Sequence, residues 1–217
     1  MTEAEKLKDK HRLVRDRQPE ALRVRIHRAL SWLQRAEQEK DDADTRFLFL
    51  WISLNAAYAQ EFGFELSERD QTRQFIQKVL ARDQAGRLHD AVHRQFTGPI
   101  RTLIDNKFVF EPFWKAMREH DASDHWETQF SAGKRLATRA IVEKQTDVVL
   151  SVVLDRLYVL RNQIVHGGAT WNSGANRTQL RDGAAILATI MPVIIDVMIE
   201  DVTDDFEAIA YPLVPGG

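Results

Sequence analysis

Apolar residues recur at helical spacing along most of this chain, and this periodicity limits the fold more than any other feature of the sequence. Two long segments near the end show it best. Between 147 and 165 valine, leucine and isoleucine form one broad stripe, and the segment from 177 to about 200 repeats the pattern. Alternation typical of strands is hard to find. The periodicity therefore predicts an all-α bundle.

Further helices are predicted from the same periodicity and from local start and stop signals. They are expected at 20–39, 46–62 and 69–83, as shorter pieces over 84–120, and around 132–143. The "DDADT" cluster at 41–45 is typical of a break followed by an N-cap, and Ser67 with Asp70 resembles a capping box. Gly167-Gly168 is a stop for the helix that ends near 165, and Pro192 should kink the last helix or remove one of its backbone hydrogen bonds.

Length and charge indicate how the chain is organised. Its 217 residues can bury a substantial core, and no Gly/Ser linker or internal repeat demands a second domain. The net charge is only −2, yet nine Lys or Arg residues fall between 6 and 28, and none follows Arg181. We predict a basic N-terminal segment (1–18), a helical domain (19–200) with an inserted helical region around 84–145, and an acidic tail (201–217). The basic run could contact phosphate or an acidic tail, or it could be a solvated helix face.

Cysteine is absent, which excludes disulfides, a thiol nucleophile and Cys-based metal sites. His89 and His93 share a helical face, but no third ligand stands at a convincing spacing, so neither a metal nor another cofactor is expected. The start of the chain is charged and does not resemble a signal peptide. The nearest approach to a membrane span, 183–199, contains Pro192 and Asp196. A soluble cytoplasmic protein with no membrane partner is expected.

The segment "DRLYVLRNQIVHGG" places Arg161, Asn162 and His166 at the end of a long apolar helix. Basic residues near helix C-termini often only satisfy free carbonyl groups, so a structural role is one interpretation. The other is catalytic: histidine exchanges protons near neutral pH, and arginine binds phosphate. Arg161 and His166 are five residues apart, about 140° around a regular helix. They converge only if the last turn unwinds or if a second copy of the helix faces the first.

The motif "RNQIVHG" resembles the R-x4-6-H motif of HEPN domains, in which a polar residue tends to follow the arginine, as Asn162 does here. The segments "RFLFLWISLNAAYAQ" and "GGATWNSGANRTQLRDGAAIL" are similar to a bacterial branch of that superfamily, and the resemblance covers about residues 20–200. It implies a HEPN-like antiparallel helical bundle with extra helices. It also implies a homodimer whose composite site cleaves RNA without a metal, leaving a 2′,3′-cyclic phosphate.

The resemblance assigns roles to single residues. His166 would be the general acid and base, Arg161 the phosphate and transition-state stabiliser, and Asn162 an orienting group. Proteins of this superfamily often act as toxins paired with an antitoxin, or in defence against phage, so such a partner is expected beside the RNA substrate. The alternatives are a non-catalytic HEPN-like module that binds RNA or nucleotide, and a helical dimerisation or scaffold protein.

Further residues near the motif are candidates for substrate binding or support. Trp171, Asn172, Arg177 and Arg181 carry stacking, hydrogen-bonding and charged groups suited to single-stranded RNA. A structural alternative has Asn176 cap the last helix while Trp171 plugs its base. Asn55, in an apolar helix, needs a hydrogen-bond partner if buried and could support the end of the 147–165 helix with Tyr58. Trp51 and Tyr58 are expected to be core residues, and base-stacking surfaces are the alternative.

Overall fold

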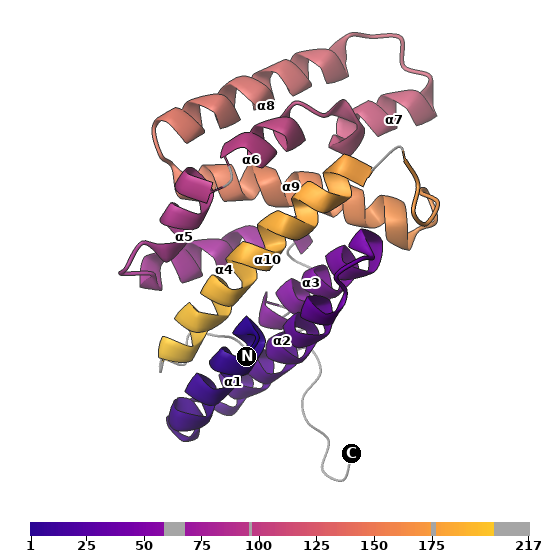
Figure 1. The fold of residues 1–217 in the computed structure, drawn as a ribbon. Coiled ribbons are helices and arrows are strands. Elements are labelled where there is room, and N and C mark those ends of the chain that lie inside the picture. The colour runs from indigo at the N-terminus through magenta and orange to yellow at the C-terminus, as the bar shows by residue number, and fades with distance from the viewer. Residues whose placement is uncertain (59–67, 96, 175–176, 202–217) are drawn as a thin grey trace. The chain divides into compact units, whose positions relative to one another are not determined.

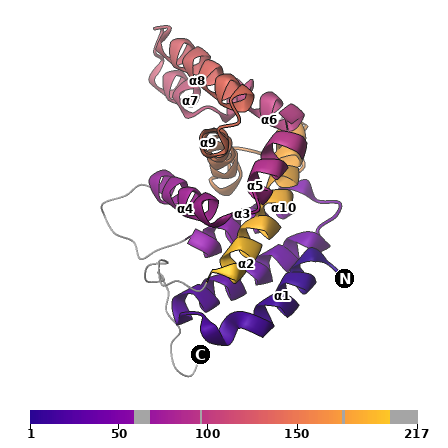
Figure 2. The same ribbon diagram turned by 90° about the vertical axis from the view of Figure 1, so that its left-hand side faces the viewer.

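The computed structural model describes residues 1–58, 68–95, 97–174 and 177–201, and every regular element within these ranges is helical. The predicted all-α class is therefore confirmed. The chain divides into two compact units, one of residues 1–85 with 187–217 and one of residues 86–186 (Figures 1 and 2). The predicted boundaries at 18, 84, 145 and 200 stay predictions.

The first unit is built around two long helices that follow one another along the chain. Its elements are α1 (Glu3–Val14), the 3-10 turn η1 (Arg15–Arg17), α2 (Glu20–Gln38), α3 (Ala43–Tyr58), α4 (Glu68–Arg82) and the C-terminal part of α10 (Arg177–Glu200). α2 and α3 pack along their length, with Leu22 and Ile26 of α2 and Phe47 and Leu54 of α3 fully buried. Ser53 adds a hydrogen bond from its hydroxyl to the Ala29 carbonyl at 2.8 Å.

Asp42 caps α3, which begins at Ala43, inside the 41–45 segment that was predicted to be a break and N-cap before a helix from 46. Its carboxylate accepts hydrogen bonds from the backbone N–H groups of Asp44 and Thr45, at 3.0 and 3.1 Å, and from the Thr45 hydroxyl. An aspartate that accepts from N–H groups at the start of a helix satisfies donors that have no partner inside the helix. The capping box predicted from Ser67 and Asp70 cannot be compared, because Ser67 lies outside the described residues.

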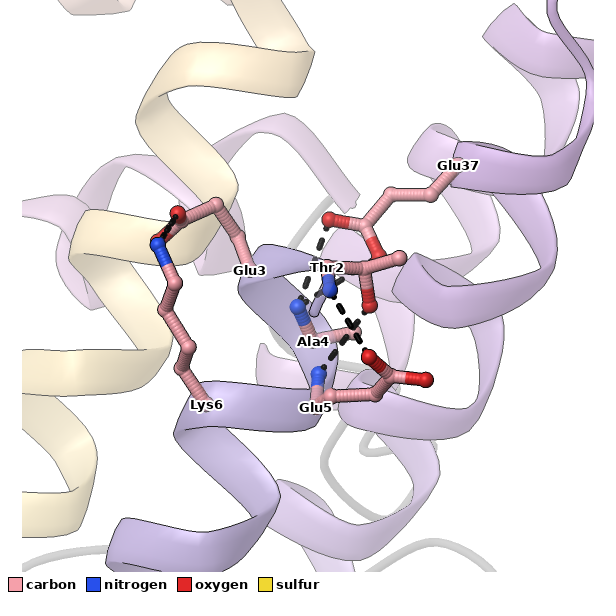
Figure 3. Close-up of polar contacts among 6 residues, drawn as sticks. All are labelled: Thr2, Glu3, Ala4, Glu5, Lys6 and Glu37. Atoms are coloured by element: carbon pink, nitrogen blue, oxygen red, sulfur yellow. Dashed lines mark hydrogen bonds and ion pairs between the residues drawn. The ribbon is translucent and has the colours of Figure 1, made fainter.

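α1 is fastened at its beginning by the contacts drawn in Figure 3. Thr2 and Glu5 form a reciprocal capping box, in which each side chain accepts from the backbone N–H of the other. The backbone N–H of Ala4 donates to the Glu37 carboxylate near the end of α2, at 3.2 Å. The basic N-terminal segment is thus a helix packed on α2, with Ala4 and Leu7 buried.

Gln18 and Lys10 join the start of the chain to the end of α10. The buried Gln18 amide donates to the carbonyls of Met198, Ile199 and Asp201, at 3.0 to 3.3 Å. Lys10 pairs with Asp196 and Glu200. Because the last carbonyls of a helix lack partners inside it, Gln18 acts as a C-terminal cap supplied from elsewhere in the chain.

α10 runs unbroken through Pro192, although proline removes one backbone donor from the ladder. The helix is long and apolar enough to cross a membrane by length and composition, with a mean hydropathy of 1.9 over 18 residues. This segment was discounted as a membrane span because it contains Pro192 and Asp196, and that criterion was too strict. However, 61% of that window is buried within the protein, as in the core helix of a soluble protein.

The second unit is arranged around α9. Its elements are α5 (Arg87–Asp90), the π-helical turn η2 (Ala91–Gln95), α6 (Thr97–Ile104), the 3-10 turn η3 (Lys107–Val109), α7 (Glu111–Glu119), α8 (His125–Val142), α9 (Thr146–Val165) and the N-terminal part of α10. α9 contacts α6, α8, η2 and η3, and its Val149, Val153 and Leu157 are fully buried. The predicted boundaries of α9 and α10 agree with these ends to within one residue.

α8 begins at His125, seven residues before the predicted start at about 132. The earlier start is explained by aromatic contacts that the sequence pattern does not show. They join the beginning of α8 to α7 and to Phe110, the residue before α7. The Trp126 ring lies 5.0 Å from that of Phe113, and the Phe130 ring lies 5.4 Å from that of Phe110. These tertiary contacts favour a helix in a segment whose other residues are mostly polar and exposed.

Candidate functional site

The predicted catalytic motif occupies the last turn and a half of α9. Arg161 is half-buried, and its guanidinium carbon lies 4.7 Å from the centre of the Tyr158 ring, three residues earlier on the same helix. An arginine over an aromatic face gains a cation–π attraction and loses freedom of movement. Tyr158 thus holds the Arg161 guanidinium against the helix, although sequence reasoning did not select it. The spacing of three residues was the available signal.

Asn162 and His166 lie four residues apart on one face of α9. His166 is exposed, whereas the Asn162 Oδ1 atom is buried. Within the described part of the chain this oxygen accepts no hydrogen bond. A buried carbonyl oxygen without a donor is costly, and such atoms in native proteins call for an explanation. An incoming donor, from a ligand or another side chain, would supply what it lacks.

The end of α9 shows where the helix stops being regular. The backbone N–H of His166 still donates to the Asn162 carbonyl at 3.0 Å, in helical register. Gly167 then has φ +71°, a left-handed conformation that glycine adopts without strain. Unwinding therefore starts after His166 and cannot rotate His166 toward Arg161. Their regular spacing of about 140° remains, so one copy of α9 does not bring the two side chains to the same face.

Gly168 is needed for another reason, which is that the chain packs closely against Gln163 at this position. A Cβ atom added there would stand 3.3 Å from the Gln163 carbonyl oxygen, closer than ordinary contact. Gln163 is itself anchored, because its side-chain amide donates to the Phe108 carbonyl of η3 at 2.7 Å. The Gly-Gly stop therefore turns the chain back over a fixed part of α9. This places the following loop beside the end of the helix that carries the motif.

The predicted substrate-binding residues follow in this loop and at the start of α10. Trp171 is 70% exposed, which does not fit the role of a plug under the last helix. Asn172 is exposed and has φ +55°, and Arg181 is exposed, whereas Arg177 is half-buried. Asn176, the predicted cap of α10, lies outside the described residues. The four predicted substrate-binding residues belong to the same compact unit as Arg161 and His166.

The two predicted supporting residues belong to the other unit. The Tyr58 hydroxyl donates to Asn55 Oδ1 at 2.9 Å, so the Asn55 amide has the partner that the sequence argument required. Tyr58 and Trp51 are 4% and 3% exposed, which makes them core residues. Asn55 and Tyr58 are in residues 1–85, and the motif is in residues 86–186. Their supporting role stays a prediction.

His89 and His93 lie next to each other, as their spacing predicts, and His93 also contacts Thr146. Their rings lie 4.8 Å apart, and His93 shares a hydrogen bond of 3.2 Å with the Thr146 hydroxyl. Burial lowers the pKa of His93, and the charges of His89 and Lys144 lower it further. Over the described ranges no group of three or more His, Cys, Asp or Glu side chains is placed to hold a metal ion.

Arg156, one of the earlier residues of α9, was missed by sequence reasoning. It is 4% exposed, and its guanidinium carbon lies 4.3 Å from the Phe110 ring centre and 5.2 Å from that of Phe130. Burial lowers its pKa to about 10, against a smaller rise from Asp155. Its Nη1 atom makes no hydrogen bond to any described residue. An arginine in an apolar helix was the available signal, but nothing in the local pattern indicates its burial.

Comparison of the chain with protein-family models, with curated proteins and with solved structures gave no match in any of the three. The resemblance to HEPN domains therefore rests on the sequence motif, and the argument for chemistry rests on the site itself.

Proposed function

We propose that this protein is a metal-independent endoribonuclease of the HEPN type, acting as a homodimer with a composite site. The observation that carries the proposal is the polar end of α9. An exposed imidazole stands one turn after a buried amide oxygen that has no donor in the described chain. On another face of the same helix end, the Arg161 guanidinium is held on a tyrosine ring. These are the groups that phosphodiester transfer needs: a proton carrier, an orienting acceptor and a cation.

In the proposed reaction a ribose 2′-OH attacks the adjacent phosphorus. His166 of one copy takes the 2′-OH proton as the O2′–P bond forms, and the second His166 gives a proton to the 5′ oxygen as the P–O5′ bond breaks. The products are a 2′,3′-cyclic phosphate and a 5′-OH. Arg161 stabilises the charge that develops on the phosphoryl oxygens, and Asn162 Oδ1 accepts from the substrate or the imidazole.

Two copies are part of the proposal because one regular helix keeps Arg161 and His166 on different faces. Residues from a second α9 would bring an arginine of one copy beside a histidine of the other. Exposed Trp171 would stack on a base, and Asn172, Arg177 and Arg181 would bind the RNA backbone. We place this activity in the cytoplasm, as a toxin or phage-defence effector with an antitoxin or defence-system partner.

The proposal is tested by incubating the purified chain with RNA in EDTA. Cleavage with cyclic-phosphate ends should persist, and His166→Ala and Arg161→Ala should abolish it. His125→Ala and Arg135→Ala are matched controls, because both residues are exposed and belong to α8, outside the motif. RNA binding without cleavage would favour a non-catalytic module. Cleavage that EDTA stops, or that survives both site variants, would refute the proposed chemistry.

The composite site has its own test, which is the activity of mixed dimers. Neither His166→Ala nor Arg161→Ala should cleave RNA alone. Dimers of one unmodified copy and one His166→Ala copy should also fail to cleave RNA, because the proposed reaction takes one His166 from each copy. Cleavage by such dimers, once they are shown to form, would mean that one His166 is enough and would refute the composite site. Growth inhibition on expression, relieved by His166→Ala, would support a toxin.

A further inference from the structure

A polar cavity of about 370 Å³ opens in the first unit where the chain turns from α1 through η1 into α2. Its lining contains three arginines and two histidines against two carboxylates. The full set is His11 of α1, Arg15 and Asp16 of η1, and Glu20, Arg23, Val24, His27 and Arg28 of α2. A cavity of this size can hold a small molecule. The α9 motif belongs to the other unit.

The cavity is basic because of how α2 is patterned. The residues that α2 contributes recur at spacings of three and four, so they share one face of the helix. The neighbouring face carries Leu22, Ile26 and Leu30, which are buried in the core. The α1–η1 turn then brings Arg15 and His11 to the basic face. Part of the basic run seen in the sequence is therefore folded into a concave site.

The hydrogen bonds of Gln18 determine the tautomer of His11, the only buried ionisable group in the lining. The amide nitrogen of Gln18 donates to three carbonyls at the end of α10. The amide oxygen therefore faces His11, and an amide oxygen can only accept a hydrogen bond. His11 Nε2 lies 3.0 Å from that oxygen and must carry a hydrogen. The proton that His11 gains or loses is therefore the one on Nδ1.

The surroundings of His11 oppose that second proton when no anion is bound. Burial lowers the pKa of His11, and the charges of Arg15, His27 and Arg23 lower it further, against a rise from the Gln18 hydrogen bond. An anion among these cations would neutralise the repulsion and favour the imidazolium. Binding and protonation should therefore assist each other, which gives the site a measurable signature.

We propose that this cavity binds the phosphate monoester group of a small hydroxylated molecule, such as a sugar phosphate. Guanidinium groups match phosphate oxygens in geometry and charge. The cavity is larger than a phosphate needs, so it has room for the rest of the molecule. Asp16 and Glu20 are exposed, where they would accept hydrogen bonds from sugar hydroxyls. The same carboxylates would repel the further phosphates of RNA, which disfavours a polyanion.

Isothermal titration calorimetry on the full chain tests the proposal with defined probes: ribose 5-phosphate, inorganic phosphate, dimethyl phosphate and an RNA oligonucleotide. Ribose 5-phosphate should bind most tightly at one saturable site, and dimethyl phosphate, a monoanion, at least about tenfold more weakly. Arg23→Gln should weaken ribose 5-phosphate by at least about tenfold, since it removes a charge-assisted hydrogen bond. Arg17→Gln is the matched control, because Arg17 is exposed on η1 outside the cavity.

Binding should also raise the pKa of His11, followed by NMR of its ring protons, and this shift should be absent in Arg23→Gln. The proposal is overturned if no probe saturates, or if Arg17→Gln loses as much affinity as Arg23→Gln. It also fails if RNA binds through Arg23 while the small phosphates do not. A peptide of residues 202–217 is a last comparison. If it binds through Arg23 and ribose 5-phosphate does not, the cavity accepts carboxylates instead.

Discussion

Replacing Arg156 by methionine should stabilise the protein, although it removes a large buried side chain from the middle of α9. Arg156 is 4% exposed and makes no hydrogen bond through Nη1 to any described residue. Burying a charge whose hydrogen bonding is incomplete is unfavourable, and a hydrophobic residue of similar volume is often a better occupant. Methionine fits this space, and its sulfur contacts aromatic rings favourably.

The magnitude follows from two opposing effects. The pKa of Arg156 falls to about 10 because of burial, which corresponds to a cost of roughly 3 kcal/mol for the charged form. The contacts with the Phe110 and Phe130 rings, at 4.3 and 5.2 Å, return about 1–2 kcal/mol together. The difference predicts that Arg156→Met raises the free energy of unfolding by about 1–2 kcal/mol.

Urea denaturation at pH 7 measures this change, with circular dichroism and tryptophan fluorescence followed together to test for two-state unfolding. The midpoint should rise while the slope stays the same. Arg135→Met, at an exposed position of α8, is the control and should change stability by less than about 0.5 kcal/mol. A loss of about 1 kcal/mol or more in Arg156→Met would refute the reasoning, because the ring contacts would then outweigh the cost of burial.

The pH dependence gives an independent check on the sign. The folded protein binds the Arg156 proton less tightly than the unfolded chain does, so above pH 10 the folded state releases it first. The contribution of Arg156 to the free energy of unfolding therefore rises as the pH increases above 10. Arg156→Met lacks the group, so its advantage over the unmodified protein should shrink above pH 10. A constant difference from pH 7 to 11 would contradict the assigned pKa.

Three further results are expected. Gln18→Ala should destabilise the protein by about 1–3 kcal/mol, because it leaves buried carbonyls of the α10 end without a donor; the exposed Gln129→Ala should change the urea midpoint little. The folded pKa of His11 is lowered, so stability should fall as pH drops from about 6.5 through that pKa, and His11→Asn should remove this part of the acid dependence of thermal unfolding. If His166 carries both protons, the cleavage rate should be bell-shaped near neutral pH, and a flat profile from acid to alkaline pH would argue against that role.

Local pattern was enough for the elements whose formation depends on neighbouring residues. The boundaries of α9 and α10, the cap at Asp42 and the turn at Gly167 follow from periodicity and from the conformations that aspartate and glycine favour. The start of α8 was placed too late, since its aromatic residues pack against residues in and just before α7. Such contacts are invisible to a pattern taken one segment at a time.

The candidate site also has features that the local sequence predicts and features that depend on tertiary contacts. The sequence placed Arg161, Asn162 and His166 at a helix end and predicted a polar loop after them. Only the structure showed that α9 stays regular through His166, that Tyr158 holds Arg161, and that Asn162 Oδ1 is buried without a donor in the described chain. Each of these depends on side-chain direction and burial, which spacing does not determine.

The sequence by itself determined the helical class, the order of the main helices and the gathering of basic residues near the start, because each is encoded by residues close together in the chain. Tertiary structure decided which of those basic side chains surround a cavity, which arginine is buried among rings, and how Gln18 closes the end of α10. The physical reason is that burial and hydrogen bonding depend on segments far apart in sequence, and their positions follow from packing of the whole core.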